Sequence, residues 1–196
     1  MPKKNGRNTK ARIVSAAWKL FYEQGYENTT IEDIVFEAET SKGSFYHYFE
    51  GKDALLGSLA DLFDEKYTEL TERAEMDSDS FSVLLFLNRE LFSMIENSID
   101  PDLLTRLYST QLITKGPKQL LDHNSVYYKL LRKIISEGQE KGEITAKMTV
   151  GDIVRYYAMC ERGLIYDWCL SGANYSLRDY GSEVMPMYLN DLFKKS

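Results

Sequence analysis

Apolar residues recur along this chain at intervals of three and four, the period of an α-helix, and no segment alternates by two as a strand would. Within the first fifty residues this pattern predicts three short helices, at 8–24, 30–38 and 41–49. Gly25 ends the first of them and Gly51 follows the third. The inward side of the first helix is formed by Ile13, Ala16, Ala17, Leu20 and Phe21.

Longer helical patterns fill the rest of the chain. They are a helix at 52–75, one at 81–97, one that starts at Pro101, one from Pro117 to Lys141, one at 149–170 and one from 176 to 196, with an interruption expected near Pro186. The sequence therefore predicts an all-α fold of about nine helices. We expect a three-helix head at residues 1–51 and a larger helical body at 52–196, with the helix 52–75 as the connector.

The second and third predicted helices have the spacing of a helix-turn-helix. Only Glu39 and Thr40 separate 30–38 from 41–49, and such a short break can hold the second helix across the major groove of DNA. Ser41 is a favourable residue to cap the start of that second helix.

The helix at 41–49 has two chemically different sides. Phe45 and Phe49 lie one turn apart and predict the buried side, while Gly43 lets the backbone approach a partner closely. The polar residues of the other side can bind phosphate oxygens or base edges, and they are Ser41, Lys42, Ser44, Tyr46 and His47.

The segment from Thr9 to Leu56 resembles the DNA-binding domain of the tetracycline-repressor (TetR) family of bacterial regulators. The matching residues are Ile13, Ala16, Ala17, Leu20, Phe21, Gly25, Thr29, Thr30, Ile34, Ala38, the run from Ser41 to Phe49, Lys52 and Leu55. The rest of the chain resembles the family only in length and helical content. In one departure, Glu39 and Thr40 stand where the family usually has Gly and an aliphatic residue, so Glu39 would have to adopt a turn conformation that suits Gly.

The resemblance implies a role for each matching polar residue. Tyr46 and Lys52 would hold the DNA backbone, and Thr29 or Thr30 would offer a hydroxyl or a helix N-terminal amide to a phosphate. The residues facing the groove would be Lys42, Gly43, Ser44 and His47, with Ser41 beside them. Taken singly, Lys42 and Lys52 would be ordinary surface lysines. The implied function is a transcriptional regulator, more typically a repressor than an activator, that binds double-stranded DNA at a palindromic operator as a homodimer.

Charge is distributed unevenly along the chain, whose formal net charge is −6. Residues 1–19 contain six basic residues and no acidic one, whereas residues 53–196 contain 16 basic and 23 acidic residues. This asymmetry predicts that only the N-terminal end of the chain meets phosphate.

The predicted helix at 149–170 is apolar nearly all round, which requires partners on two sides. Its apolar residues include Tyr156, Tyr157, Met159, Cys160, Leu164, Ile165, Trp168 and Leu170. Together with the helix at 176–196 it predicts a four-helix interface between two copies of the chain. The alternative is a central buried helix in a monomer, and the resemblance favours the dimer.

The body is also rich in aromatic residues. The resemblance implies that it encloses a pocket for a small-molecule effector, still unidentified, whose binding releases DNA. The candidate lining residues are Tyr108, Tyr127, Tyr157 and Trp168. The helix at 52–75 would then be the mechanical link to the head.

No enzyme, metal site or cofactor is predicted. His47 and His123 are the two histidines, no Cys/His cluster has metal spacing, and no phosphate-binding glycine motif or nucleophile elbow occurs. Cys160 and Cys169 lie nine residues apart on one helix, which predicts two small buried residues and no disulfide between them.

A cytoplasmic location is expected. The start of the chain lacks the apolar segment of a signal peptide, and the apolar stretch 153–170 carries too many ionisable groups to span a membrane.

The main alternative is a helical protein-interaction or ligand-carrier module that does not bind DNA. The acidic total charge and Glu39 would suit it. Binding to duplex DNA that weakens steeply with salt separates the two hypotheses.

Overall fold

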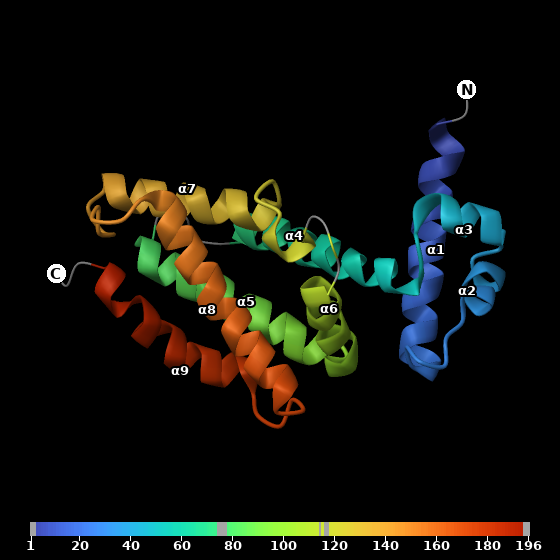
Figure 1. Cartoon of the computed structure of the whole chain (residues 1–196). Helices are drawn as coiled ribbons and strands as arrows, with labels where there is room; N and C mark the ends of the chain where they lie inside the picture. The colour runs from blue at the N-terminus through green and yellow to red at the C-terminus, as the bar shows by residue number, and fades with distance from the viewer. Residues whose placement is uncertain (1–2, 74–77, 114, 116–117, 194–196) are drawn as a thin grey trace. The chain divides into compact units, whose positions relative to one another are not determined.

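The computed structural model describes residues 3–73, 78–113, 115 and 118–193, with side chains from residue 9 onward. The described residues form nine α-helices and three short 3-10 helices (Figure 1). Extended pairing among them is limited to a single bridge between Ile144 and Phe193. The prediction of an all-α fold is confirmed.

The chain divides into two compact units, Met1–Leu59 and Ala60–Ser196, which we call the first and the second unit. The first contains α1 (Lys3–Gln24), α2 (Ile31–Glu37) and α3 (Lys42–Tyr48). Each of these three helices packs against the other two. Their shared core includes Ile13, Ala17, Phe21, Ile34, Val35, Phe45 and Phe49. The three-helix arrangement expected near the N-terminus is therefore confirmed.

The expected helix at 52–75 is not one continuous α-helix. Lys52–Gly57 is a 3-10 helix, and α4 (Ser58–Arg73) follows it. Residues 74 and 75 lie outside the described part of the chain. Because the 3-10 segment buries Leu55 and Leu56, it belongs to the first unit rather than to a separate connector.

Hydrogen bonds explain why the first unit continues past the expected boundary at residue 51. The indole nitrogen of Trp18 donates to the Ser58 hydroxyl at 2.7 Å, and the Tyr26 hydroxyl donates to the carboxylate of Asp53. These contacts tie the 3-10 segment and the start of α4 to the end of α1 and the loop after it.

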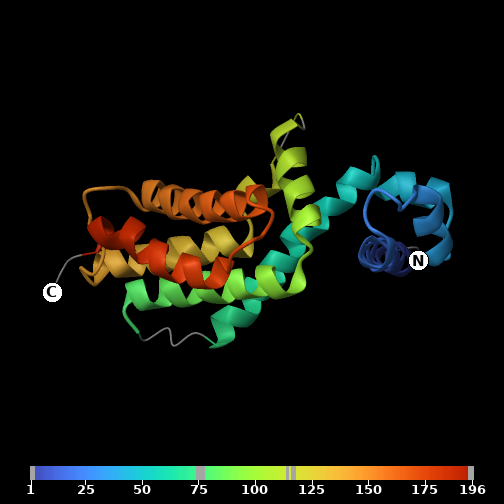
Figure 2. The same ribbon diagram turned by 90° about the horizontal axis from the view of Figure 1, so that it is seen from below.

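The second unit holds most of α4 and five further helices. These are α5 (Ser80–Ser98), α6 (Pro101–Ile113), α7 (Val126–Glu140), α8 (Val150–Leu170) and α9 (Leu177–Leu189). Helix α5 packs along α9 and against α7, while α8 contacts α6, α7 and α9 (Figure 2). Since α8 touches three helices, its inward residues are central to the core of this unit.

The contact between α5 and α9 depends on one glycine. A Cβ at Gly181 of α9 would lie 2.4 Å from a ring carbon of Phe92 of α5, far inside van der Waals contact. The absent side chain lets the Phe92 ring pack directly against the α9 backbone, and both residues are buried.

Helix α7 starts later than predicted. It begins at Val126 rather than near Pro117, which lies outside the described residues, and a short 3-10 helix at Gln119–Leu121 precedes it. Ser125 caps the helix, and the Asp64 carboxylate accepts hydrogen bonds from the amides of residues 126 and 127 at 3.0 and 3.2 Å. Satisfied amides at this point fix the start of the helix.

Helix α9 runs through Pro186 without the expected interruption and ends at Leu189, before a 3-10 turn at Asn190–Leu192. Proline removes a single backbone donor, and the buried Met185 and Leu189 hold the helix on both sides of it. Residues 194–196 of the expected helix lie outside the described part.

Cys160 and Cys169 are free thiols and half-buried, not fully buried as predicted. Among the described helices, none is long and apolar enough to cross a membrane.

Candidate nucleic-acid interface and interior cavity

Both helices of the helix-turn-helix start at a side-chain cap. Thr30 forms a capping box with Asp33: the Asp33 amide donates to the Thr30 hydroxyl at 3.1 Å, and the Thr30 amide donates to the Asp33 carboxylate at 2.9 Å. The Thr30 hydrogen bonds lower the pKa of Asp33. Ser41 caps α3 by accepting from the Ser44 amide at 3.1 Å, as the sequence predicted.

The turn between α2 and α3 places Glu39 in the left-handed region, at φ 46°. The Thr40 amide reaches back to the Val35 carbonyl at 2.9 Å, a bond typical of a helix C-terminus closed by a left-handed residue. The prediction that Glu39 must adopt a conformation suited to Gly is confirmed.

Arg12 of α1 supports this turn. Its Nε donates to the Ala38 carbonyl at 3.0 Å, and its guanidinium also donates to the carbonyls of Ala38 and Glu39. A cation at the C-terminal end of a helix also interacts favourably with the helix dipole. The sequence indicated Arg12 only as part of a basic segment, because the contact joins residues 26 and 27 positions apart.

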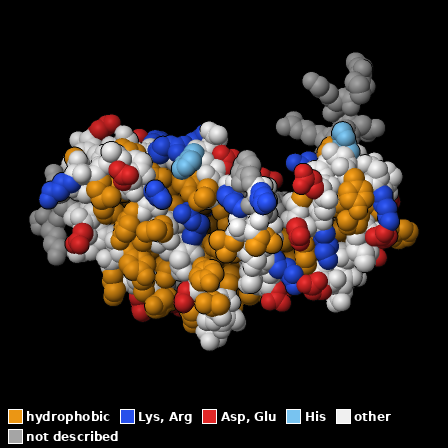
Figure 3. Space-filling model, in the orientation of Figure 1, with side chains coloured by type: hydrophobic (Ala, Val, Ile, Leu, Met, Phe, Trp, Pro, Cys, Tyr) orange, Lys and Arg blue, Asp and Glu red, His pale blue; other side chains and the backbone are white. Residues whose placement is uncertain are grey.

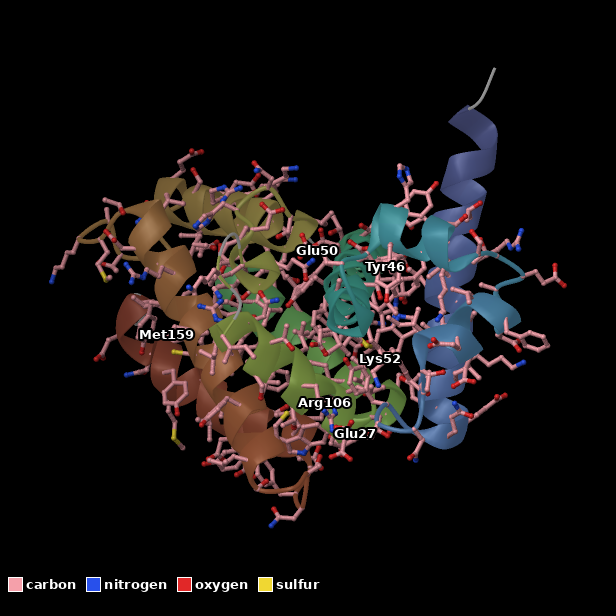
Figure 4. All side chains as sticks on the ribbon, turned by 45° about the vertical axis from the view of Figure 1, so that its right-hand side comes forward. Glu27, Tyr46, Glu50, Lys52, Arg106 and Met159 are labelled. Carbon is pink, nitrogen blue, oxygen red and sulfur yellow. The ribbon has the colours of Figure 1, made fainter. Side chains whose placement is uncertain are left out.

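The polar side of α3 faces solvent. Phe45 and Phe49 are buried beneath it, whereas the Tyr46 side chain is 56% exposed and projects from the helix (Figure 4). We call this surface the outer face of α3. It consists of Ser41, Lys42, Gly43, Tyr46 and His47, which are exposed, and Ser44, which is half-buried.

Lys42 on the outer face pairs with a carboxylate of α2. Its Nζ contacts Glu32, and both side chains are more than half exposed. The hydrogen bond raises the pKa of Lys42 and lowers that of Glu32. The positive charge of Lys42 is therefore balanced by Glu32. A phosphate or base would have to compete with Glu32 for the Lys42 ammonium.

Thr29 or Thr30 was expected to offer a hydroxyl or a helix N-terminal amide to a phosphate, and of the two Thr29 is buried. Its side chain is 1% exposed, and its hydroxyl donates to the Gly25 carbonyl at 2.8 Å. The reason is that the loop after α1 folds back on the end of that helix and encloses Thr29. The neighbouring Thr30 is exposed.

Lys52, expected to hold the DNA backbone, makes contacts within the first unit. Its Nζ donates to the carbonyls of Tyr26 at 2.6 Å and Thr29 at 2.9 Å, and it lies 4.2 Å from the centre of the Tyr26 ring. The side chain therefore holds the loop between α1 and α2. In this structure its ammonium therefore has a structural role in the first unit.

The second unit contains a cavity of about 80 Å³. Its lining comes from α4, α5, α6, α7, α8 and the segment leading into α7: Ala60, Phe63, Asp64, Tyr67, Leu91, Ile95, Tyr108, Gln119, Leu120, Ser125, Tyr127, Tyr128, Glu161, Arg162 and Ile165. Two of the four expected residues, Tyr108 and Tyr127, belong to this lining.

The other two expected residues are used elsewhere in the core. The Tyr157 hydroxyl donates to the Leu84 carbonyl at 2.9 Å, and the indole nitrogen of Trp168 donates to the Tyr175 carbonyl at 2.9 Å. Neither residue lines the cavity, because both point from α8 toward other neighbours.

A buried carboxylate stands at the cavity. Glu161 is 2% exposed and accepts hydrogen bonds from the Asn88 amide at 2.8 Å and the Tyr127 hydroxyl at 2.5 Å. Burial raises the pKa of Glu161, against the opposing effect of these donors. Within the described residues, no group of His, Cys, Asp and Glu has the arrangement of a metal site.

Residues 13–59 match the family model for bacterial regulatory proteins of the tetR family. The HTH-type transcriptional regulator YvdT of Bacillus subtilis is 31% identical over 135 residues, which cover 68% of this chain and 69% of YvdT. This chain belongs to the tetR family. The family match spans α3 and the Glu39 turn, so the outer face of α3 is part of the DNA-binding domain of a transcriptional regulator.

Solved structures of the tetR family share the fold along nearly the whole chain. FadR of Thermus thermophilus, a repressor solved with lauroyl-CoA, has a TM-score of 0.76 at 20% identity and covers 95% of this chain and 96% of its own. A tetR-family regulator of Pectobacterium atrosepticum has a TM-score of 0.75 at 17% identity, covering 100% and 99%. The second unit thus has the fold of the family's larger domain.

Proposed function

We propose that this tetR-family regulator is a repressor that places the outer face of α3 in the major groove of a palindromic operator. The observation that carries the proposal is the division of α3 into a buried side, Phe45 and Phe49, and an exposed polar side. Buried phenylalanines fix the helix in the first unit, and the polar side stays available to DNA.

The chemistry of the outer face suits a division of roles. Lys42 and His47 carry donors that can reach base edges, while Tyr46, Ser41 and Ser44 offer hydroxyl groups to phosphate oxygens. Gly43 has no side chain to hold the backbone away from DNA. Thr30, exposed at the start of α2, is a further candidate for phosphate contact.

We propose that two copies associate through α8 and α9. Hydrophobic side chains gather over these helices in Figure 3, and Met159 projects outward from α8 in Figure 4. Met159, Tyr166 and Leu170 follow one side of α8 and are 55%, 50% and 72% exposed. Exposed apolar residues on α9 include Tyr180, Met187 and Tyr188. An apolar face of this kind is typical of a subunit interface, and Gly163 on the same side of α8 permits close helix approach.

We further propose that a small effector bound in the cavity of the second unit lowers DNA affinity. FadR of Thermus thermophilus was solved with lauroyl-CoA, which supports a ligand-binding role for this type of domain. Helix α4 begins with Ser58 in the first unit and continues to Arg73 in the second, so it is the covalent route for such a signal.

The test is selection of bound fragments from the host's own DNA, followed by fluorescence anisotropy with the selected duplex over a range of salt. We expect saturable binding that weakens steeply as salt rises. Tyr46→Phe and Lys42→Ala should each weaken it, while Tyr22→Phe, an exposed tyrosine of α1, is the matched control. Absent binding, or binding that ignores salt and both outer-face variants, would support the alternative of a module that does not bind DNA.

A further inference from the structure

The cavity of the second unit is lined on one side by two buried polar residues. Glu161 of α8 and Tyr67 of α4 both line it, and each is 2% exposed. The remaining walls are mainly apolar and aromatic. Five aromatic rings contribute to them: Phe63, Tyr67, Tyr108, Tyr127 and Tyr128.

Tyr67 has an unsatisfied hydroxyl. Among the described residues, this buried hydroxyl oxygen has no hydrogen-bond partner. Burial and the nearby groups Glu161, Tyr108 and Asp64 raise the pKa of Tyr67. These three neighbours all line the cavity, which places the hydroxyl end of Tyr67 at the cavity wall. A buried polar group without a partner costs stability, and a ligand group that pairs with it would recover that cost.

Tyr127 contacts both Glu161 and Tyr67. The Tyr127 hydroxyl donates to Glu161, and the Tyr127 ring centre lies 4.8 Å from that of Tyr67. In the described part of the chain, Glu161 takes part in no ion pair; its direct partners are neutral amide and hydroxyl groups, and the Arg162 guanidinium lowers its pKa without direct contact. A buried carboxylate with only neutral donors is stabilised further by a cation.

The other charged groups of the lining are already engaged. The Asp64 carboxylate accepts from the first amides of α7, and Arg162 donates to the Tyr128 hydroxyl at 3.0 Å. Arg162 is half-buried, whereas Glu161 is enclosed. The side of the cavity lined by Glu161 and Tyr67 is therefore acidic. Aromatic rings around it favour a cation through their π faces.

We infer that the cavity binds an aralkylamine in its ammonium form, with N–H groups donating to Glu161 and Tyr67 and the aromatic part packed among the apolar walls. This assignment rests on the proposed effector role of the cavity and gives the chemical class of the effector. A ligand whose anionic group entered first would place like charge against Glu161.

The test compares three probes of matched shape: phenethylamine, 2-phenylethanol and phenylacetate, which are a cation, a neutral molecule and an anion at about pH 7.5. Binding to the full chain is measured by isothermal titration and by saturation-transfer NMR. We expect phenethylamine to bind about tenfold or more tightly than 2-phenylethanol, with phenylacetate weakest. Equal binding of all three, or tighter binding of phenylacetate, overturns the inference.

Two variants locate the cation. Glu161→Gln should remove the preference for the amine over the alcohol. Tyr67→Phe should weaken amine binding and, because it removes an unsatisfied hydroxyl, raise the Tm of the free protein. A merely structural hydroxyl would give the opposite result, a lower Tm with unchanged amine binding. Tyr67→Phe carries the test alone if Glu161→Gln does not fold. Matched controls are Tyr22→Phe on α1 and Glu65→Gln on α4, both exposed.

Parallel anisotropy with the selected DNA separates this inference from the proposed function. Amine binding that leaves DNA affinity unchanged supports the ligand class and contradicts the effector role. A protein that binds its DNA but not the amine contradicts the ligand class and leaves the regulator assignment in place.

Discussion

The Nε of Arg12 lies 3.0 Å from the carbonyl oxygen of Ala38, so a side chain of α1 closes the C-terminal end of α2. This bond fixes the direction in which the chain leaves α2 and enters the turn toward α3. The orientation of the outer face of α3 therefore depends on a residue that does not belong to the helix-turn-helix itself.

Replacing Arg12 should loosen the turn. We expect Arg12→Met to lower the free energy of unfolding of the first unit by about 1–2 kcal/mol, because carbonyls of the turn lose a charged donor. The measurement is amide hydrogen exchange at Thr40, whose amide bonds to Val35 within the turn. Arg155→Met, an exposed arginine of the second unit, is the control. Unchanged Thr40 protection would show that the turn holds without Arg12.

Glu39 stores backbone strain. Glu39→Gly should raise the free energy of unfolding by about 1 kcal/mol relative to Glu39→Ala, since Gly accepts the left-handed conformation without a Cβ penalty. The two variants remove the same charge, so their difference reports the backbone alone. Denaturant unfolding of both proteins measures it. Equal midpoints would mean that the position carries no strain.

Glu32 competes with DNA for Lys42. Glu32→Gln should strengthen DNA binding several-fold, because it releases Lys42 and removes a negative charge beside the outer face. Stability should change little, since exposed ion pairs contribute little. Anisotropy at low salt measures the affinity, with Glu23→Gln on α1 as the control. Weaker DNA binding by Glu32→Gln would instead mean that the ion pair with Glu32 positions the Lys42 side chain for DNA.

Replacing Lys52 distinguishes a structural role of its side chain from a contact with DNA. Lys52→Met should lower the free energy of unfolding by about 1–2 kcal/mol, because the carbonyls of Tyr26 and Thr29 lose a shared donor. The salt dependence of DNA binding should keep its slope, since no phosphate contact is lost. A slope reduced by about one, with normal stability, would restore the direct phosphate contact that the family pattern implies.

The pH dependence of stability should report Glu161. Burial raises its pKa in the folded state, so the folded protein holds a proton more tightly than the unfolded chain does. The contribution of Glu161 to the free energy of unfolding is complete below the ordinary glutamate pKa. It is lost as the pH rises through the raised pKa of the folded state. The free energy of unfolding of the wild type should therefore fall relative to that of Glu161→Gln as the pH rises above the ordinary glutamate pKa. Urea titrations at several pH values measure it, and a constant difference contradicts the prediction.

The local parts of the candidate site were predictable from the sequence. Phe45 and Phe49 are buried and Ser41 caps α3, because spacing along one helix determines which side each residue takes. The left-handed conformation of Glu39 was predicted from the family resemblance, because the family usually has Gly at this position.

Contacts between distant segments were not predictable. Thr29 and Lys52 match the family pattern as candidate DNA contacts. In the structure, their polar groups donate hydrogen bonds to backbone carbonyls of the loop after α1. Helical periodicity carries no information about such bonds. In the second unit, sequence reasoning used Glu161 only as a charge that excludes a membrane span, and it passed over Tyr67. The cavity that joins them depends on how α4 and α8 face each other within that unit.

Helix α3 has only seven residues, and helices of this length are unstable alone in water. The packing of the buried Phe45 and Phe49 stabilises the helix. Substitutions at the exposed Lys42, Tyr46 or His47 therefore change the free energy of unfolding little. Operator preference can consequently diverge during evolution through these positions at small structural cost, and duplicated genes with the same core can come to control different promoters.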